Sequence, residues 1–198
     1  RQALDSSVSV PAERSMHTEV HVHGVVAIKN SVSQSELEQA LASWLNYVDI
    51  ESLGEARSAH QDEPGVVYDR RKRMLEICWT GWVGRNFQKA LESSFEALGP
   101  LSEEASGVEV TYYHEDGRDE RGMVFVGPTS DAIESVQRRY MIEDLQDLLG
   151  RHFGEPEISE VVGLVNQLFD RRWQERGAAP ATGISERPQR TAGKRHLH

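Results

Sequence analysis

The stretch at 66–82, VVYDRRKRMLEICWTGW, decides the fold class because it holds two apolar runs separated by a charged turn. In the second run, Leu75, Ile77 and Trp79 alternate with smaller or charged side chains. A period of two is typical of a β-strand that buries one face. The polar residues at 69–73 let the chain reverse between the runs, so the stretch predicts an antiparallel hairpin.

Helical periodicity lies on both sides of this hairpin. Before it, Ser33 and Glu36 have the spacing of a capping box, in which each side chain accepts a hydrogen bond from a backbone N–H at the helix start. The helix opened by this box carries one apolar stripe, and so does the helix after the hairpin, which Gly99 and Pro100 end. The stripe residues are Leu37, Leu41, Trp44, Leu45 and Val48 before the hairpin, and Phe87, Leu91, Phe95 and Leu98 after it.

Strand periodicity also occurs before the first of these helices and after the second. The segment 18–28 alternates, and 108–112 and 123–126 form a second hairpin, which is followed by two helical segments. The order βαββαββ, followed by two C-terminal helices, predicts an α+β fold. We expect an antiparallel or mixed sheet with helices mainly on one face. The first six elements match the ferredoxin-like order, with at least one strand added.

Composition divides the chain into three parts. Residues 1–15 and 177–198 lack apolar periodicity and are predicted to be flexible segments, the second of them basic. Residues 16–176 are predicted to form a single α+β domain. The whole chain of 198 residues has a net charge of −10. Because the C-terminal segment is basic, the net charge of residues 16–176 is −13.

The cysteine count and hydropathy exclude several classes. A single cysteine, Cys78, rules out an internal disulfide framework and a multi-cysteine metal site, and it is typical of a reducing compartment. We therefore expect a cytoplasmic protein. No apolar run approaches the about 20 residues of a membrane-spanning helix, so we expect no membrane partner.

Four side chains at alternating positions of the first strand form the main candidate site. His17, Glu19, His21 and His23 project from one face, where two imidazoles and a carboxylate can hold Zn²⁺ or Fe²⁺. His114 would add a ligand if its strand lies alongside. The metal set is thus His21, His23 and His114. The ordinary interpretation, a solvated polar strand face, is favoured over a metal site.

Other catalytic patterns are missing from the sequence. It contains no phosphate-binding glycine loop, no nucleophile elbow and no HExxH zinc motif. Cys78 lies between apolar residues with no histidine near it in sequence, which is typical of an inert small side chain. We therefore predict no catalytic residue and no cofactor.

Two features suggest contact with a partner. Arg70, Arg71, Lys72 and Arg73 place four positive charges at a hairpin tip, where they could follow phosphates or enter an acidic groove. Trp82 ends a strand next to Gly81 and Gly84, where a large ring is hard to cover. Nucleic acid is a weak candidate partner because residues 16–176 are strongly acidic.

These observations favour a non-enzymatic, acidic interaction protein that binds a protein partner through Trp82 and the basic turn. In class alone, such a small acidic α+β chain resembles accessory, immunity and phage-encoded proteins that act as regulators or inhibitors. A metal-dependent enzyme built on the strand face from His17 to His23 is the first alternative, and a nucleic-acid-binding module using Arg70 to Arg73 with the basic tail is the second. The half-polar sheet face also suggests a homodimer.

Overall fold

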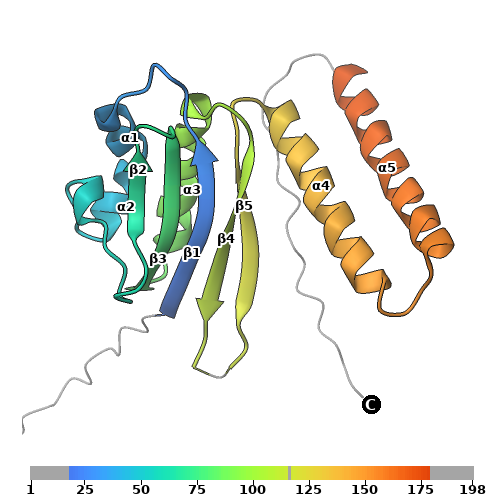
Figure 1. The fold of residues 1–198 in the computed structure, drawn as a ribbon, viewed down its shortest axis with the longest axis horizontal. Helices are drawn as coiled ribbons and strands as arrows, with labels where there is room; N and C mark the ends of the chain where they lie inside the picture. Colours follow the sequence, from blue (N-terminus) through green and yellow to red (C-terminus); the bar gives the residue numbers. More distant parts are fainter. Residues whose placement is uncertain (1–17, 116, 179–198) are drawn as a thin grey trace, which may run out of the picture. The chain divides into compact units, whose positions relative to one another are not determined.

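The computed structural model describes residues 18–115 and 117–178, which form an α+β fold (Figure 1). Its sheet has five strands: β1 (Thr18–Ala27), β2 (Gly65–Asp69), β3 (Met74–Val83), β4 (Ser106–Tyr113) and β5 (Glu120–Val126). Their order is β2-β3-β1-β4-β5, and every neighbouring pair is antiparallel. The predicted α+β class and the two predicted hairpins are confirmed, and the sheet is antiparallel rather than mixed. The ferredoxin-like order stays a prediction.

Five α-helices accompany the sheet in the described residues. They are α1 (Gln34–Ala40), α2 (Ala42–Tyr47), α3 (Phe87–Leu98), α4 (Ser130–Leu149) and α5 (Glu155–Ala178). Two short 3₁₀ turns, η1 (Leu53–Glu55) and η2 (Gly99–Leu101), follow α2 and α3. The predicted capping box at the start of α1 is present, because the Ser33 side chain accepts from the Glu36 N–H and the Glu36 carboxylate accepts from the Ser33 N–H. None of the described helices combines the length and apolarity needed to cross a membrane.

The helix predicted from Ser33 to Val48 is divided in two at Leu41. A side chain from α3 contacts the backbone at this point. The Trp44 N–H donates to Ser94 Oγ at 2.8 Å as well as to the Leu41 carbonyl at 3.0 Å, and Ser94 Oγ donates to the Leu41 carbonyl at 3.2 Å. A side chain that enters the backbone hydrogen-bond ladder bends a helix at that point. The prediction of one continuous helix was therefore wrong.

The core lies between one face of the sheet and helices α1, α2 and α3. On β1 it takes Val20, Val22 and Val26, whose neighbours in the sequence point to the opposite face. From the helices it takes large side chains, and the Trp44 ring meets the rings of Trp79, Phe87 and Phe95 edge to face. The most deeply buried of the large side chains are Trp44, Phe87, Phe95, Ile28, Leu37, Leu41, Leu75, Ile77, Leu91 and Leu98.

The chain divides into two compact units, the first ending at Met141 and the second starting at Ile142, inside α4. The first unit holds the sheet, the core and the start of α4. Within that unit, Tyr140 of α4 packs edge to face on Phe125 of β5, with ring centroids 5.8 Å apart. The second unit holds the end of α4 and α5. The prediction of one domain over residues 16–176 stays a prediction, and most residues of the two predicted flexible segments lie outside the described residues.

Candidate functional site on the open face of the sheet

The sheet face that points away from α1–α3 carries the polar side chains of β1, and we call it the open face. The strand register places three rows of side chains across it, each centred on β1. One row joins Trp82, Glu19 and Tyr113. The next row joins Thr80, His21 and Thr111, and the third joins Cys78, His23 and Glu109. The alternation of β1 thus places its two histidines in the middle of this face.

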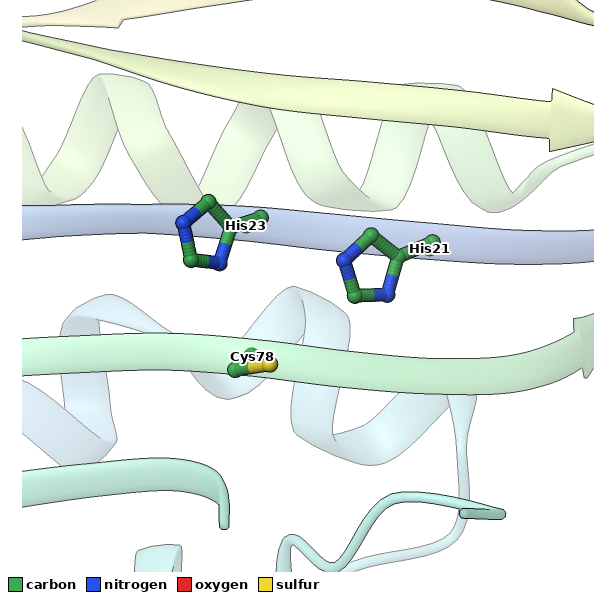
Figure 2. Close-up of side chains that lie close together, drawn as sticks. All are labelled: His21, His23 and Cys78. Atoms are coloured by element: carbon green, nitrogen blue, oxygen red, sulfur yellow. The ribbon is translucent and has the colours of Figure 1, made fainter. Parts of the chain in front are cut away.

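His21, His23 and Cys78 form a compact cluster there (Figure 2). Figure 2 shows the two imidazole rings side by side along β1, with Cys78 on the neighbouring strand β3. The rings are stacked, with centroids 6.0 Å apart and planes inclined by 10°. One ligand atom from each of the three residues lies within 4.8 Å of the other two. Cys78 is partly buried and His23 is exposed, so solvent reaches the cluster from one side.

A carboxylate from the loop before β2 reaches the edge of this cluster. Glu63 Oε1 lies 3.4 Å from His21 Nδ1 and accepts a hydrogen bond from the Thr80 hydroxyl at 3.1 Å. His21 Nδ1 is also 2.9 Å from Thr80 Oγ1. The Ser58 hydroxyl donates a hydrogen bond to the other oxygen of Glu63. The same hydroxyl accepts a hydrogen bond from the Thr80 N–H at 2.8 Å. Glu63 and Thr80 thus hold one side of the His21 ring.

The same environment acts on the cysteine. Burial raises the pKa of the Cys78 thiol, and the negative charges of Glu63 and Asp62 raise this pKa further. A raised pKa keeps the thiol protonated near neutral pH, which makes it a poor nucleophile in the absence of a cation. Burial and neighbouring carboxylates of this kind oppose a role for Cys78 as an activated catalytic nucleophile.

The structure assembles the predicted metal residues only in part. His21 and His23 are together, whereas His114 follows the end of β4, is exposed, and is not in the cluster formed by the described residues. His17 lies outside the described residues. Cys78 is the third member of the cluster, although its place between two apolar residues is typical of an inert side chain. A signal was present: Cys78 alternates with Ile77 and Trp79, so it had to lie on the polar face of β3.

Trp82 stands at the end of the open face that β2 does not reach. Its side chain is 63% exposed, the highest value among the large hydrophobic side chains described. It lines an open hollow of about 470 Å³, whose walls include Tyr47, Arg57 and the end of β3. The hydroxyl of Tyr47 accepts a hydrogen bond from the Gly84 N–H at 2.8 Å, which ties the strand end beyond Trp82 to α2. The ring is therefore exposed on a well-supported backbone.

The predicted basic cluster lies at the other end of β3. Arg70, Arg71, Lys72 and Arg73 are all exposed in the β2–β3 turn. Asp69 organises this turn, because its carboxylate accepts from the N–H groups of Arg71 and Lys72 at 2.9 and 3.1 Å, and these bonds lower the pKa of Asp69. With about 3.3 Å per strand residue, Trp82 is about 30 Å from Arg73. The two predicted partner contacts therefore cannot form one small patch.

Comparison with known proteins gives one match. A family model described as a family of unknown function, DUF6806, covers residues 18–170. These residues include both hairpins, helices α1–α4 and most of α5. Searches of curated proteins and of solved structures found no match.

Proposed function

This chain belongs to the family of unknown function DUF6806, and we propose that it is a non-enzymatic protein that binds a protein partner through the end of the open face around Trp82. The observation that carries the proposal is the 63% exposure of this tryptophan on a supported strand. Burying a large aromatic side chain stabilises a complex at low entropic cost, and tryptophan is enriched among the residues that dominate binding energy.

The row that contains Trp82 indicates the chemistry of the partner. Glu19 lies between Trp82 on β3 and Tyr113 on β4, and Tyr113 is 41% exposed. Neighbouring strands are about 4.8 Å apart, so the two aromatic residues are the register neighbours of Glu19, whose Oε1 also lies 3.4 Å from His60 Nε2. A row that holds a carboxylate and two aromatic side chains suits an arginine or lysine side chain, which can form an ion pair with the acid and a cation–π contact with a ring. We therefore propose a partner segment with an exposed basic residue.

The charge of the chain supports the same partner. Residues 16–176 have a net charge of −13, so their field attracts a basic protein surface and speeds the encounter. Nucleic acid, which is polyanionic, is disfavoured by this field. The hollow of about 470 Å³ beside Trp82 offers space for a second side chain of the partner segment. These features favour a protein over a nucleic acid at this end of the sheet.

The test is affinity capture with tagged full-length chain from cells of its source, with bound proteins quantified by mass spectrometry. We expect Trp82→Ala to reduce capture of the specific partner at least tenfold. Glu19→Gln should weaken capture and make it less sensitive to salt. The matched control is Val67→Ala on β2, because Val67 is a 41% exposed apolar side chain on the same face and distant from Trp82. This control should leave capture unchanged.

One result would contradict the proposal, and another would change the identity of the partner. Partner capture that is unchanged in both Trp82→Ala and Glu19→Gln would contradict it. Sedimentation of the purified chain gives the second readout. If the chain forms a dimer that Trp82→Ala dissociates, then the partner at this surface is a second copy of the chain.

Two finer interpretations belong to this proposal. We interpret β1–β4 with their helices as a ferredoxin-like split βαβ arrangement, supported by the position of β1 between β3 and β4 and antiparallel to both. We also propose a cytoplasmic location, supported by the single free cysteine, which suits a reducing compartment.

A further inference from the structure

We propose that His21, His23 and Cys78 together bind one transition-metal ion, with Zn²⁺ the best fit, in the middle of the open face. The proposal goes beyond partner binding and rests on a different observation, which is the meeting of three metal-ligating side chains from two strands. Neither strand carries the set alone. β1 supplies two imidazoles at positions i and i+2, and the register pairs His23 with Cys78 on β3.

The separations suit a single ion after a small adjustment. Zinc bonds of about 2.0–2.3 Å place the ligand atoms of a tetrahedral site about 3.3–3.6 Å apart. The three ligand atoms here lie within 4.8 Å of one another, so each must move by about an ångström or less. Rotations of the side-chain torsions provide such a movement, because His23 is exposed and Cys78 is only partly buried.

The hydrogen bonds of His21 involve its Nδ1 atom and leave its Nε2 atom free to bind a metal ion. The Thr80 hydroxyl has one proton, which it donates to Glu63 Oε1 at 3.1 Å. The contact of 2.9 Å between His21 Nδ1 and Thr80 Oγ1 therefore requires the imidazole to donate from Nδ1. The neutral ring then carries its lone pair on Nε2, which is the form that ligates a metal. A carboxylate and a hydroxyl behind a histidine are the usual outer contacts of a metal-binding imidazole.

Two further points define the kind of ion. One thiolate and two imidazoles suit Zn²⁺ and related transition metals, whereas Mg²⁺ and Ca²⁺ prefer sets of oxygen ligands. Glu109, the register neighbour of His23 on β4, already accepts from Thr111 Oγ1 at 3.3 Å and contacts Arg121 Nε at 3.2 Å. Three protein ligands remain, and the fourth position opens toward solvent beside His23, as in zinc sites that keep an exchangeable ligand.

The experiment uses the full chain, reduced and freed of metal with a chelator, and titrated with Co²⁺ alone. All proteins carry His196→Ala and His198→Ala, which remove two imidazoles outside the described residues. We expect one Co²⁺ per chain, with the visible bands of a four-coordinate ion and a thiolate-to-cobalt charge-transfer band. Zn²⁺ should displace Co²⁺, and Ca²⁺ or Mg²⁺ should not.

Variants identify the ligands. Cys78→Ser should abolish the charge-transfer band, and His21→Ala and His23→Ala should each weaken Co²⁺ binding at least tenfold. Cys78→Ala is a second cysteine variant in case the serine disturbs the fold, and circular dichroism checks each protein. Glu63→Gln, which alters the contact behind His21 and also removes a negative charge near Cys78, should weaken binding about 10-fold if the contact behind His21 dominates. His60→Ala and His114→Ala are the matched controls and should leave binding unchanged.

Clear results overturn the proposal. It fails if the chain does not bind Co²⁺ or Zn²⁺ at one ion per chain, or if Cys78→Ser retains the charge-transfer band. If His114→Ala weakened Co²⁺ binding as much as His21→Ala or His23→Ala does, the ligands would not be the three proposed here. Trp82→Ala should leave the Co²⁺ spectrum unchanged, so failure of the metal site and failure of partner binding can be told apart.

Discussion

The hydroxyl of Ser94 shows how a single side chain directs the backbone of a neighbouring element. It lies fully buried between α3 and the junction of α1 and α2. At this junction it accepts from the Trp44 N–H and donates to the Leu41 carbonyl, which also accepts from the Leu45 N–H at 2.9 Å within the helical turn. Because both backbone groups are buried, this serine gives each of them a further hydrogen-bond partner at a place that water does not reach.

Replacing this serine should therefore destabilise the protein. We expect Ser94→Ala to lower the free energy of unfolding by about 1 kcal/mol, because two buried hydrogen bonds to α3 are lost while the Trp44 N–H and the Leu41 carbonyl keep their backbone partners. Urea denaturation followed by fluorescence measures the change. Ser93→Ala is the matched control, since Ser93 is the exposed neighbour on the same helix. Equal stability of the two variants would contradict this account of the helix break.

Gly65 is a second residue whose identity is set by its backbone. Its φ is +83°, and a Cβ atom there would lie 2.0 Å from the Ala56 carbonyl oxygen. That oxygen also accepts from the Val66 N–H at 2.9 Å, so it is held in place. Gly65→Ala should cost more than about 1 kcal/mol of stability. Gly54→Ala is the control, because an added Cβ at Gly54 meets nothing within 4 Å. A loss in Gly65→Ala no larger than in this control would refute the argument.

At the scale of elements, β4 shows how alternation gives two neighbouring tyrosines different environments. Tyr112 packs against the core, whereas Tyr113 is 41% exposed on the open face. Burial is the main cause that raises the pKa of Tyr112 to about 12, and the negative charges of Glu120 and Glu92 add to it. The folded strand thus keeps this phenol protonated at a pH where the unfolded chain releases the proton.

This difference predicts how stability depends on alkaline pH. The unfolded phenol ionises near its ordinary pKa of 10.0, and the folded one near 12. The contribution of Tyr112 to stability is therefore complete below about pH 10 and is lost as the pH rises toward 12. Tyr112→Phe should make the decline in melting temperature over this range shallower. Tyr113→Phe, on the opposite face of the same strand, is the control. Parallel curves for Tyr112→Phe and the unmodified chain would contradict the prediction.

At the scale of the whole molecule, the core belongs to the first compact unit. The members of its main buried cluster lie between Val20 and Val126, before α4 begins, and Val136 of α4 is the one buried hydrophobic residue beyond them among the described residues. The same strands therefore supply the core with one face and carry the histidine–cysteine cluster on the other. The elements that hold the proposed metal ligands are those that hold the core.

A fragment of residues 16–150 should consequently fold by itself. We expect a cooperative thermal transition within about 4 °C of the full chain, the shift that about 1 kcal/mol produces in a domain of this size. Calorimetry of the fragment and the full chain measures it. Loss of the cooperative transition would show that residues after 150 are needed. Trimming only 1–15 and 177–198 is the milder comparison and should change the melting temperature less.

The sequence by itself determined the strands, most of the helices and their order, but not the division of the helix at Leu41. Alternation and helical spacing depend on neighbours within a few residues, so the strands, the capping box of Ser33 and Glu36 and the buried positions of Trp44 and Trp79 could be predicted. The two histidines of β1 could be assigned to one polar face for the same reason. Helix α3, with its stripe from Phe87 to Leu98, begins and ends where its spacing and its glycine indicated.

Only the tertiary structure decided which distant residues meet. Ser94 lies 50 residues from Trp44, and Cys78 lies 55 residues from the histidine beside it, so no local pattern could join them. The side-chain period of a strand assigns each residue to a face, but strand order and register decide which residue lies opposite which. The burial of all core residues together selects that register. His114 could therefore be proposed as the third ligand from sequence, and Cys78 is found in its place because β3 pairs with β1 in the register that sets Cys78 opposite His23.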